Sequence, residues 1–187
     1  MLVRHASTAA VRAAAFGADE PLDEAGRVAA GRLARRLPRA GEVLVAPTRR
    51  ARETAECAGL TVSAEEPALL ECDFGSWSGR TLSEVAESDP EGVRAWLAEP
   101  DSAPHGGETL TALLARVAAW LDGQAGRERT AIAITHGGVV KAAVVGALGA
   151  PPAAFWRIDV APGAITELHA HDGRWTVARV NDRGAER

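Results

Sequence analysis

The chain has 187 residues, of which 47% are hydrophobic and 25% are charged, and its formal net charge is −4 at pH 7. This length and apolar content suit one compact domain with a sizeable core. The slightly acidic balance disfavours a nucleic-acid-binding or membrane-surface protein, and no stretch reaches the roughly 20 apolar residues of a membrane span. Cys57 and Cys72 form no closely spaced pair, and no charged-then-apolar leader precedes the first polar motif, so we expect a cytoplasmic protein.

The first half of the chain alternates between short apolar runs and amphipathic segments. Residues 1–3 are apolar and run directly into Arg4, which predicts a short buried strand, either clipped or continued upstream. Asp23 is a typical N-cap residue, and alanine and leucine repeat at i+4 behind it. The expected elements are a helix over about 24–37, a strand over 42–46, a helix over about 48–58 and a short strand over 61–63.

The second half begins with a departure from this alternation. Residues 73–79 form a loop rich in glycine and aromatic residues, and Pro90 separates two short predicted helices, over about 81–88 and 91–98. The region of about 72–107 is too short for a core of its own, so we interpret it as an excursion over the sheet edge rather than a second domain. The expected later elements are a helix over about 108–122, a strand over 131–135, a helix over 137–148, and a β meander over 157–160, 164–169 and 174–180 with a turn at Asp172-Gly173.

These elements predict an α/β fold in a single domain over 1–187. We expect a three-layer α/β/α sandwich with a mostly parallel central sheet, helices on both faces, a small helical excursion over the active site and a C-terminal β hairpin. In such sheets ligands bind outside the carboxyl ends of the strands. Arg4-His5, Thr48 to Arg50, and His136 each follow a predicted strand directly, so three separate strands should deliver polar side chains to one edge.

Two arginines, two histidines and a carboxylate at one edge suit a phosphate monoester. Arg4 and Arg50 can each offer a planar fork of donors to phosphate oxygens. Their positive field disfavours protonation of a nearby imidazole, so His5 is expected to stay neutral and nucleophilic. Glu71 is the natural proton donor to the leaving alkoxide, and it can afterwards deprotonate the water that cleaves phosphohistidine. Because the arginines supply the positive charge, no metal ion or cofactor is expected.

Further donors complete the predicted phosphate site. His136, protonated beside a bound dianion, would donate to a third phosphate oxygen. The N–H groups of the loop after His5 and the helix start at Gly137 place partial positive charge where the anion binds. The predicted phosphate-binding residues are Arg4, Ser7, Thr8, Arg50, His136 and Gly137.

Four motifs in chain order resemble the histidine phosphatase superfamily, which has the phosphoglycerate mutase-like fold. They are Arg4-His5, the segment Pro47-Thr48-Arg49-Arg50-Ala51, the Glu71 loop that runs through Phe74-Gly75 and Trp77 to Gly79, and Thr135-His136-Gly137-Gly138. The Glu71 loop and Gly106-Gly107-Glu108-Thr109 resemble the phosphatase and α-ribazole phosphatase branch. The resemblance implies that His5 is phosphorylated and that Arg50, rather than Arg49, is the second arginine of the site.

The chain departs from the family pattern at several positions. Ala6 stands where the family usually has glycine, so a positive φ there would be costly. Val11 replaces an asparagine that sugar-phosphate-handling members often have, and Lys141 replaces a common arginine.

Three functions stay open from the sequence. The leading one is metal-independent hydrolysis of a small phosphorylated metabolite through phospho-His5. The alternatives are a phosphoglycerate mutase-type phosphotransferase, although the chain lacks the longer insertions of those enzymes, and a catalytically degenerate binding module. Asp73 and Glu108 are rival acids to Glu71. The sequence also leaves open the physiological substrate and the oligomeric state, a homodimer included.

Overall fold

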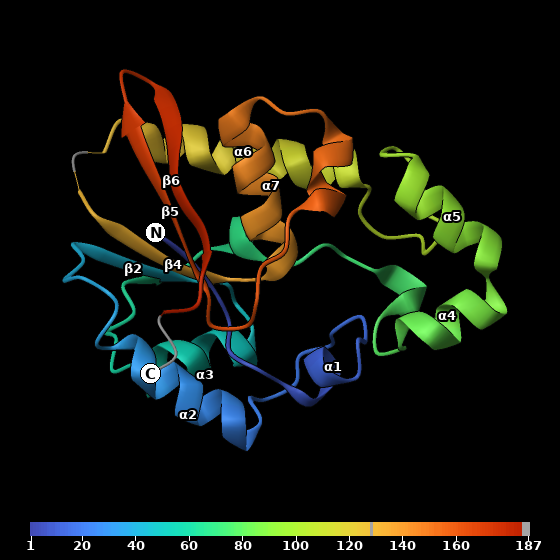
Figure 1. The fold of residues 1–187 in the computed structure, drawn as a ribbon, viewed down its shortest axis with the longest axis horizontal. Helices are drawn as coiled ribbons and strands as arrows, with labels where there is room; N and C mark the ends of the chain where they lie inside the picture. Colours follow the sequence, from blue (N-terminus) through green and yellow to red (C-terminus); the bar gives the residue numbers. More distant parts are fainter. Residues whose placement is uncertain (128, 185–187) are drawn as a thin grey trace.

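The centre of the protein is a mixed sheet built from the apolar runs of the sequence. The computed structural model describes residues 1–127 and 129–184, and within them six strands form one sheet in the order β3-β2-β4-β1-β5-β6 (Figure 1). The strands β3, β2, β4 and β1 pair in parallel, and β5 and β6 add an antiparallel hairpin beside β1. Their bounds are β1 Leu2–Arg4, β2 Glu42–Val45, β3 Ala64–Glu65, β4 Ala131–Thr135, β5 Ile165–His171 and β6 Arg174–Asp182.

Helices cover both faces of this sheet, which confirms the predicted α/β/α sandwich. α2 (Glu24–Leu33) and α3 (Arg49–Cys57) pack together on one face, and α6 (Leu110–Ala125) and α7 (Gly137–Leu148) pack together on the other (Figure 1). The apolar stripe of α6 is buried, whereas α7 is buried on most sides because it lies between α6 and the sheet. None of the described helices is long and apolar enough to cross a membrane.

Two predicted element boundaries in the first half are shifted in the structure. The helix after Asp23 ends at Leu33, because the chain then tightens into a turn in which the Arg36 N–H donates to the Leu33 carbonyl oxygen. The short strand predicted over 61–63 lies at 64–65 instead.

The strand predicted over 157–160 is wrong. Residues 152–157 form a short 3-10 helix, η3 (Pro152–Arg157), which Pro151 precedes and which Phe155 anchors in the core. No strand is assigned at 158–160 in the described chain. The Val160 carbonyl oxygen accepts a hydrogen bond from the side chain of Arg4, so that backbone is satisfied by an arginine rather than by a neighbouring strand.

The excursion of about 72–107 forms a lobe beside the main body (Figure 1). It contains η2 (Gly75–Trp77), α4 (Leu82–Ser88) and α5 (Pro90–Ala98). Its buried apolar cluster consists of Trp77 and Val85 together with Phe16, which comes from the loop after α1 (Ala9–Arg12). Because this cluster needs a residue from outside the excursion, the lobe is packed on the N-terminal loop and does not have a core of its own.

Because α2 packs closely against the loop after β1, we expect the effect of a glycine-to-alanine substitution on the free energy of unfolding to depend on its position in α2. An ideal Cβ at Gly26 would lie 2.2 Å from the Ser7 carbonyl oxygen, whereas one at Gly31 of the same helix meets nothing closer than 3.7 Å. We expect Gly26→Ala to destabilise the protein by about 1–3 kcal/mol. Gly31→Ala should be neutral or stabilising by up to about 1 kcal/mol, since alanine is the better helix former. Urea unfolding followed by circular dichroism measures both, and equal free energies of unfolding for the two variants would contradict the prediction.

Candidate active site

The ends of three neighbouring strands meet at one edge of the sheet. β4 pairs in parallel with β1 and with β2, and its register sets Arg4 opposite Thr135. The His5 N–H donates to the Thr135 carbonyl oxygen at 2.8 Å. The imidazole rings of His5 and His136 lie 5.1 Å apart between centroids. The structure therefore brings together the polar residues that follow these strands, as the sequence predicted.

The imidazole of His5 is neutral and keeps one nitrogen free. Its Nδ1 lies 2.8 Å from the Ala6 carbonyl oxygen, which can only accept, so Nδ1 carries the proton and Nε2 keeps its lone pair. Burial, with smaller contributions from Arg50 and Arg4, lowers the pKa of His5 to about 3. The expectation of a neutral His5 at neutral pH agrees with this geometry.

The alanine that replaces the usual glycine fits without backbone strain. Ala6 is fully buried, and its N–H donates to Thr54 Oγ1 at 3.0 Å. Within the described residues, the non-glycine residues with positive φ are Ala14, Asp172 and Asn181. Ala6 is not one of them, so this departure from the family pattern carries no conformational cost.

His136 is held in the opposite tautomer. The Arg50 Nε–H donates to His136 Nδ1 at 3.3 Å, so Nδ1 is unprotonated and Nε2 carries the hydrogen. That Nε2 is buried and has no hydrogen-bond partner within the described chain. Burial first, and then the nearby His5 imidazole and the positive charges of Arg50 and Arg4, lower the pKa of His136 well below 6.5. Without a bound anion His136 is therefore neutral, and its protonation beside a dianion stays a prediction.

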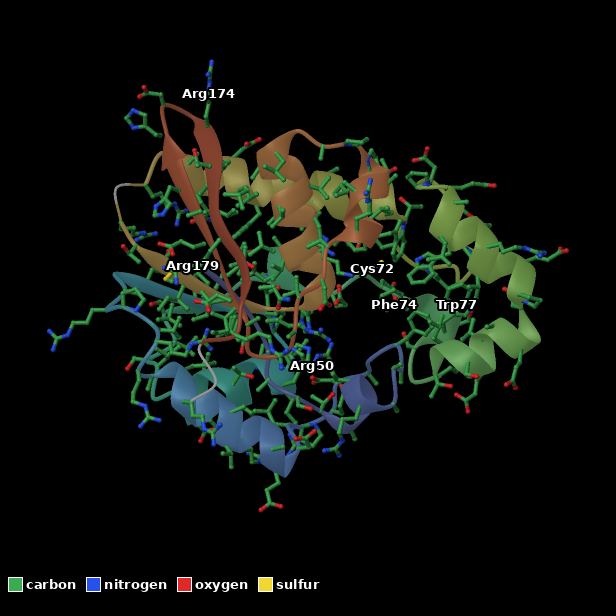
Figure 2. All side chains as sticks on the ribbon, in the orientation of Figure 1. Arg50, Cys72, Phe74, Trp77, Arg174 and Arg179 are labelled. Atoms are coloured by element: carbon green, nitrogen blue, oxygen red, sulfur yellow. The ribbon has the colours of Figure 1, made fainter. Side chains whose placement is uncertain are left out.

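Of the two predicted arginines, Arg50 is buried and Arg4 is half-buried. Arg4 Nη1 donates to the Val160 carbonyl oxygen at 2.5 Å, while Arg4 Nε is buried without a partner in the described structure. Arg50 is 5% exposed and extends from the start of α3 into the interior of the molecule (Figure 2). A buried donor without a partner costs about 1–3 kcal/mol. The unpartnered nitrogens of Arg4 and of the second histidine therefore indicate a site for an acceptor such as an anion.

Glu20 is a residue of the site that was not predicted from the sequence. One of its carboxylate oxygens accepts from the Thr8 hydroxyl at 2.9 Å, and the other lies 3.2 Å from Arg50 Nη1, which also donates to the Ala18 carbonyl oxygen. Glu20 therefore orients both Thr8 and Arg50. No signal in the sequence marks it, because it is one of two adjacent acids in an irregular loop.

The hydroxyl groups of the predicted phosphate-binding loop are already bonded within the protein. Ser7 Oγ donates to Asp23 Oδ2 at 2.8 Å, and the Thr8 hydroxyl donates to Glu20. Each hydroxyl has a single hydrogen to donate. Any contact of Ser7 or Thr8 with phosphate would therefore come from the backbone N–H groups.

Glu71 lies against the start of α7. Its Oε2 accepts the Gly138 N–H at 3.1 Å, and its Oε1 accepts the Cys72 N–H at 3.0 Å. An ideal Cβ at Gly138 would lie 2.1 Å from Oε1. Glycine at this position is therefore what admits the carboxylate to the helix start, beside Arg4 and Gly137.

The rival groups have other partners. Glu108 forms an ion pair with Arg116 at 2.7 Å, and Asp73 is exposed and accepts a backbone N–H within its own loop. His105 is 2% exposed, and its ring packs edge-on against Phe74 in the excursion. In the part of the chain that the structure describes, no three His, Cys, Asp or Glu side chains are grouped to hold a metal ion.

A cavity of about 210 Å³ opens beside Arg4 and Glu71. The start of α7 forms part of its wall, and the rest is lined largely by Phe74, Trp96, Phe155, Trp156, Lys141 and Asp159. Trp96 of α5 and Trp156 of η3 pack with their ring centroids 4.7 Å apart, so they join the excursion to the main body. A larger hollow of about 770 Å³ lies at the amino end of the sheet around Met1 and contains none of the predicted site residues.

Comparisons with known proteins identify the family of this chain. The sequence model of the histidine phosphatase superfamily (branch 1) matches residues 1–183. Phosphoserine phosphatase 1 of Hydrogenobacter thermophilus is 30% identical over 172 residues, which cover 87% of this chain and 81% of the relative. A protein of Mycobacterium tuberculosis named as bifunctional is 36% identical over 169 residues, which cover 83% of this chain and 44% of the relative, so the chain spans less than half the length of that protein. The chain belongs to the histidine phosphatase superfamily.

Solved structures agree with this assignment. A mycobacterial glucosyl-3-phosphoglycerate phosphatase in complex with VO3 superposes with a TM-score of 0.83 at 26% identity, over 97% of both chains. A putative α-ribazole-5′-P phosphatase from Escherichia coli has a TM-score of 0.85 at 25% identity, over 99% of this chain and 97% of the other.

The neutral histidines predict that the protein loses stability on acidification. In the unfolded chain both histidines have a pKa near 6.5, whereas in the folded protein the pKa of His5 is about 3 and that of His136 is also depressed. Below pH 6.5 the unfolded chain therefore binds more protons than the folded protein. As the pH decreases below 6.5, the free energy of unfolding should decrease by about 1.4 kcal/mol per pH unit for each histidine that stays neutral in the folded protein.

Urea unfolding at pH 7, 6 and 5 measures this slope. His5→Gln should reduce the slope of the free energy of unfolding against pH by the contribution of one histidine. His171→Gln, which replaces a side chain that is 90% exposed, should leave the slope unchanged. A wild-type free energy of unfolding that is flat between pH 7 and 5 would show that the two imidazoles are not buried in the neutral form.

Proposed function

We propose that this protein is a metal-independent phosphomonoester hydrolase that acts on a small phosphorylated metabolite through a phosphohistidine at His5. The observation that carries the proposal is the opposite tautomers of the two histidines. His5 presents a lone pair on Nε2, His136 presents a hydrogen on Nε2, and the buried Arg4 Nε beside them has no partner in the described chain. A nucleophile next to unsatisfied donors suits a phosphoryl group, which needs an attacking atom and partners for its oxygens.

Substrate binding would satisfy the buried donors. The phosphate oxygens accept from Arg4, Arg50 and His136, and the first N–H groups of α7 from Gly137 onward add the partial positive charge of a helix N-terminus. The N–H groups of the loop after His5 complete the cradle. The bound dianion then favours protonation of the second histidine, because an opposite charge nearby stabilises the charged imidazole.

In the first chemical step, His5 Nε2 attacks phosphorus in line with the ester oxygen. The P–N bond forms as the P–O ester bond breaks, and Glu71 donates its proton to the leaving oxygen. Arg4 and Arg50 stabilise the charge on the non-bridging oxygens as it redistributes. The products of this step are the free alcohol, phosphohistidine and the Glu71 carboxylate.

In the second step, Glu71 takes a proton from a water molecule and the water oxygen attacks phosphorus. The P–N bond breaks, inorganic phosphate leaves, and the Nε2 lone pair of His5 is restored. Glu71 is protonated again, so the cycle closes without any further reactant.

The relatives support hydrolysis as the outcome. The proteins named phosphoserine phosphatase 1 and glucosyl-3-phosphoglycerate phosphatase are hydrolases of small phosphorylated metabolites by name. A mutase would instead return the phosphoryl group to a second substrate. Incubation with phosphoglycerate and a bisphosphorylated primer separates the two, since a phosphatase releases inorganic phosphate and a mutase releases isomerised phosphoglycerate.

We further propose a cytoplasmic setting and a single domain. The free thiols of Cys57 and Cys72 support the first, and the family match over residues 1–183 supports the second.

Replacement of the nucleophile should abolish turnover. We expect the wild-type protein to hydrolyse p-nitrophenyl phosphate in excess EDTA, and His5→Ala to retain less than about 1% of that activity, because no other group supplies the attacking atom. His171→Ala, at an exposed position, is the matched control and should retain full activity. Circular dichroism checks that both variants fold. A folded His5→Ala variant with a tenth of wild-type activity would exclude the phosphohistidine route.

Loss of the proton donor should affect substrates according to their leaving group. An alkyl alkoxide needs a proton to leave, and general acid help is typically worth about 10²–10⁴-fold, whereas nitrophenolate leaves unaided. Glu71→Gln should therefore slow phosphorylation of the enzyme by alkyl phosphates far more than by p-nitrophenyl phosphate. With the latter, phosphoenzyme should accumulate, because the same carboxylate activates the water of the second step.

Rapid-quench measurements on Glu71→Gln follow both halves of the reaction. Asp73→Asn replaces the neighbouring acid and should change neither rate. Equal losses for the two substrates without trapped phosphohistidine would assign the acid–base role to another group.

A further inference from the structure

Lys141 is the only lysine of the chain and lies in the wall of the cavity beside the phosphate site. It is on α7, one helical turn beyond Gly137. Its side chain is half-buried, and its ammonium lies 5.3 Å from the centroid of the Phe155 ring. Within residues 1–127 and 129–184, Lys141 forms neither a hydrogen bond nor an ion pair.

The anions around Lys141 do not pair with it. Glu71 uses both carboxylate oxygens to accept backbone N–H groups, and Asp159 is exposed and acts on Lys141 only from beyond ion-pair distance. Burial is the main cause that lowers the pKa of Lys141, and Arg4 adds to it, while Glu71 and Asp159 act in the opposite direction. A half-buried ammonium without a partner is stabilised by any anion that enters the cavity.

The cavity has room for a small group that carries such an anion. Its volume is about 210 Å³, which accommodates a leaving group of a few carbon atoms. One helical turn advances about 5.4 Å along the axis, so the backbone of Lys141 lies about that far along α7 from Gly137. The remaining wall is aromatic, from Phe74, Trp96 and Trp156. A small leaving group in this cavity would thus meet, besides Arg4, an ammonium that has no ion-pair partner among the described residues.

We propose that Lys141 is a specificity-determining residue whose ammonium pairs with a second anionic group, a carboxylate or a second phosphate, on the leaving group of the substrate. The proposal rests on the proposed hydrolase function, since the cavity continues from the phosphate site. Substrates that carry a second anion a few bonds from the phosphate ester are then preferred over uncharged analogues.

Matched pairs of substrates test this preference. 3-Phosphoglycerate and glycerol 1-phosphate differ in a carboxylate against a hydroxymethyl group, and propane-1,3-diol bisphosphate and its monophosphate differ in the second phosphate. A hydrogen bond between charged groups predicts a ratio of kcat/KM of about 10- to 100-fold in favour of the charged member of at least one pair. The ratio within one variant cancels effects on the catalytic steps that both substrates share.

Variants in the cavity wall show which residue causes the ratio of kcat/KM between charged and uncharged substrates. Lys141→Met should bring the ratio close to one, and Lys141→Arg should retain most of it, because the charge is kept. Asp159→Asn removes the opposite charge from the same cavity and should leave the ratio unchanged or raise it. A ratio near one for both pairs in the wild type, or a ratio that Lys141→Met leaves intact, overturns the proposal.

A binding measurement separates this proposal from the hydrolase function. Reductive methylation with ¹³C-formaldehyde labels only Lys141 and the N-terminal amine, since the chain has no other lysine. In the His5→Ala protein, 3-phosphoglycerate or the bisphosphate should shift the ¹³C signal of Lys141 more than the uncharged analogues do. A shift without wild-type turnover supports the anion site and overturns the hydrolase function. Turnover without any selective shift overturns the role of Lys141 and leaves the hydrolase function standing.

Discussion

The position of β4 between β1 and β2 is the constraint on which the candidate active site depends. All three strands run in parallel, so the residues that follow them emerge at one edge, and the register sets Arg4 opposite Thr135. A slip of one residue would turn the side chains of a strand to the other face and would separate His5 from His136. Burial of the apolar strands under helices on both faces specifies the register, because a slip would expose core side chains.

The electrostatics of the site follow from the same burial. Arg50 and the two histidines are buried and Arg4 is half-buried beside them, and among the described residues Arg50 has one carboxylate partner, Glu20. Unpaired buried charge is costly, so both histidines are neutral, and the arginines use backbone carbonyl oxygens as partners. Donors remain unsatisfied, and a bound anion would repay part of their desolvation. The unsatisfied donors lower the stability of the fold at this edge and are the groups that the proposed phosphate would bind.

One helix combines three parts of the proposed chemistry. In the proposed mechanism the N-terminus of α7 adds its partial positive charge beside the anion, and its first residue, Gly137, lies against Arg4, whose Nε is 3.4 Å from an ideal Cβ there. The absence of a Cβ at Gly138 admits Glu71. Lys141, one turn later, lines the cavity beside Arg4 and Glu71. The glycine at position 138 therefore lets the Glu71 carboxylate reach the helix start, close to Arg4.

The sequence by itself determined the fold class and the meeting of the strand ends, because apolar runs and amphipathic periods record which faces are buried. It also identified His5 and His136 as neighbours, although their catalytic roles remain predictions. Only the tertiary structure decided the tautomers, the role of Glu20, the unpaired state of Lys141 and the short helix where a strand was expected over 157–160. Arg50 and His136 are 86 positions apart in the chain, and no local pattern encodes which nitrogen such a distant partner contacts.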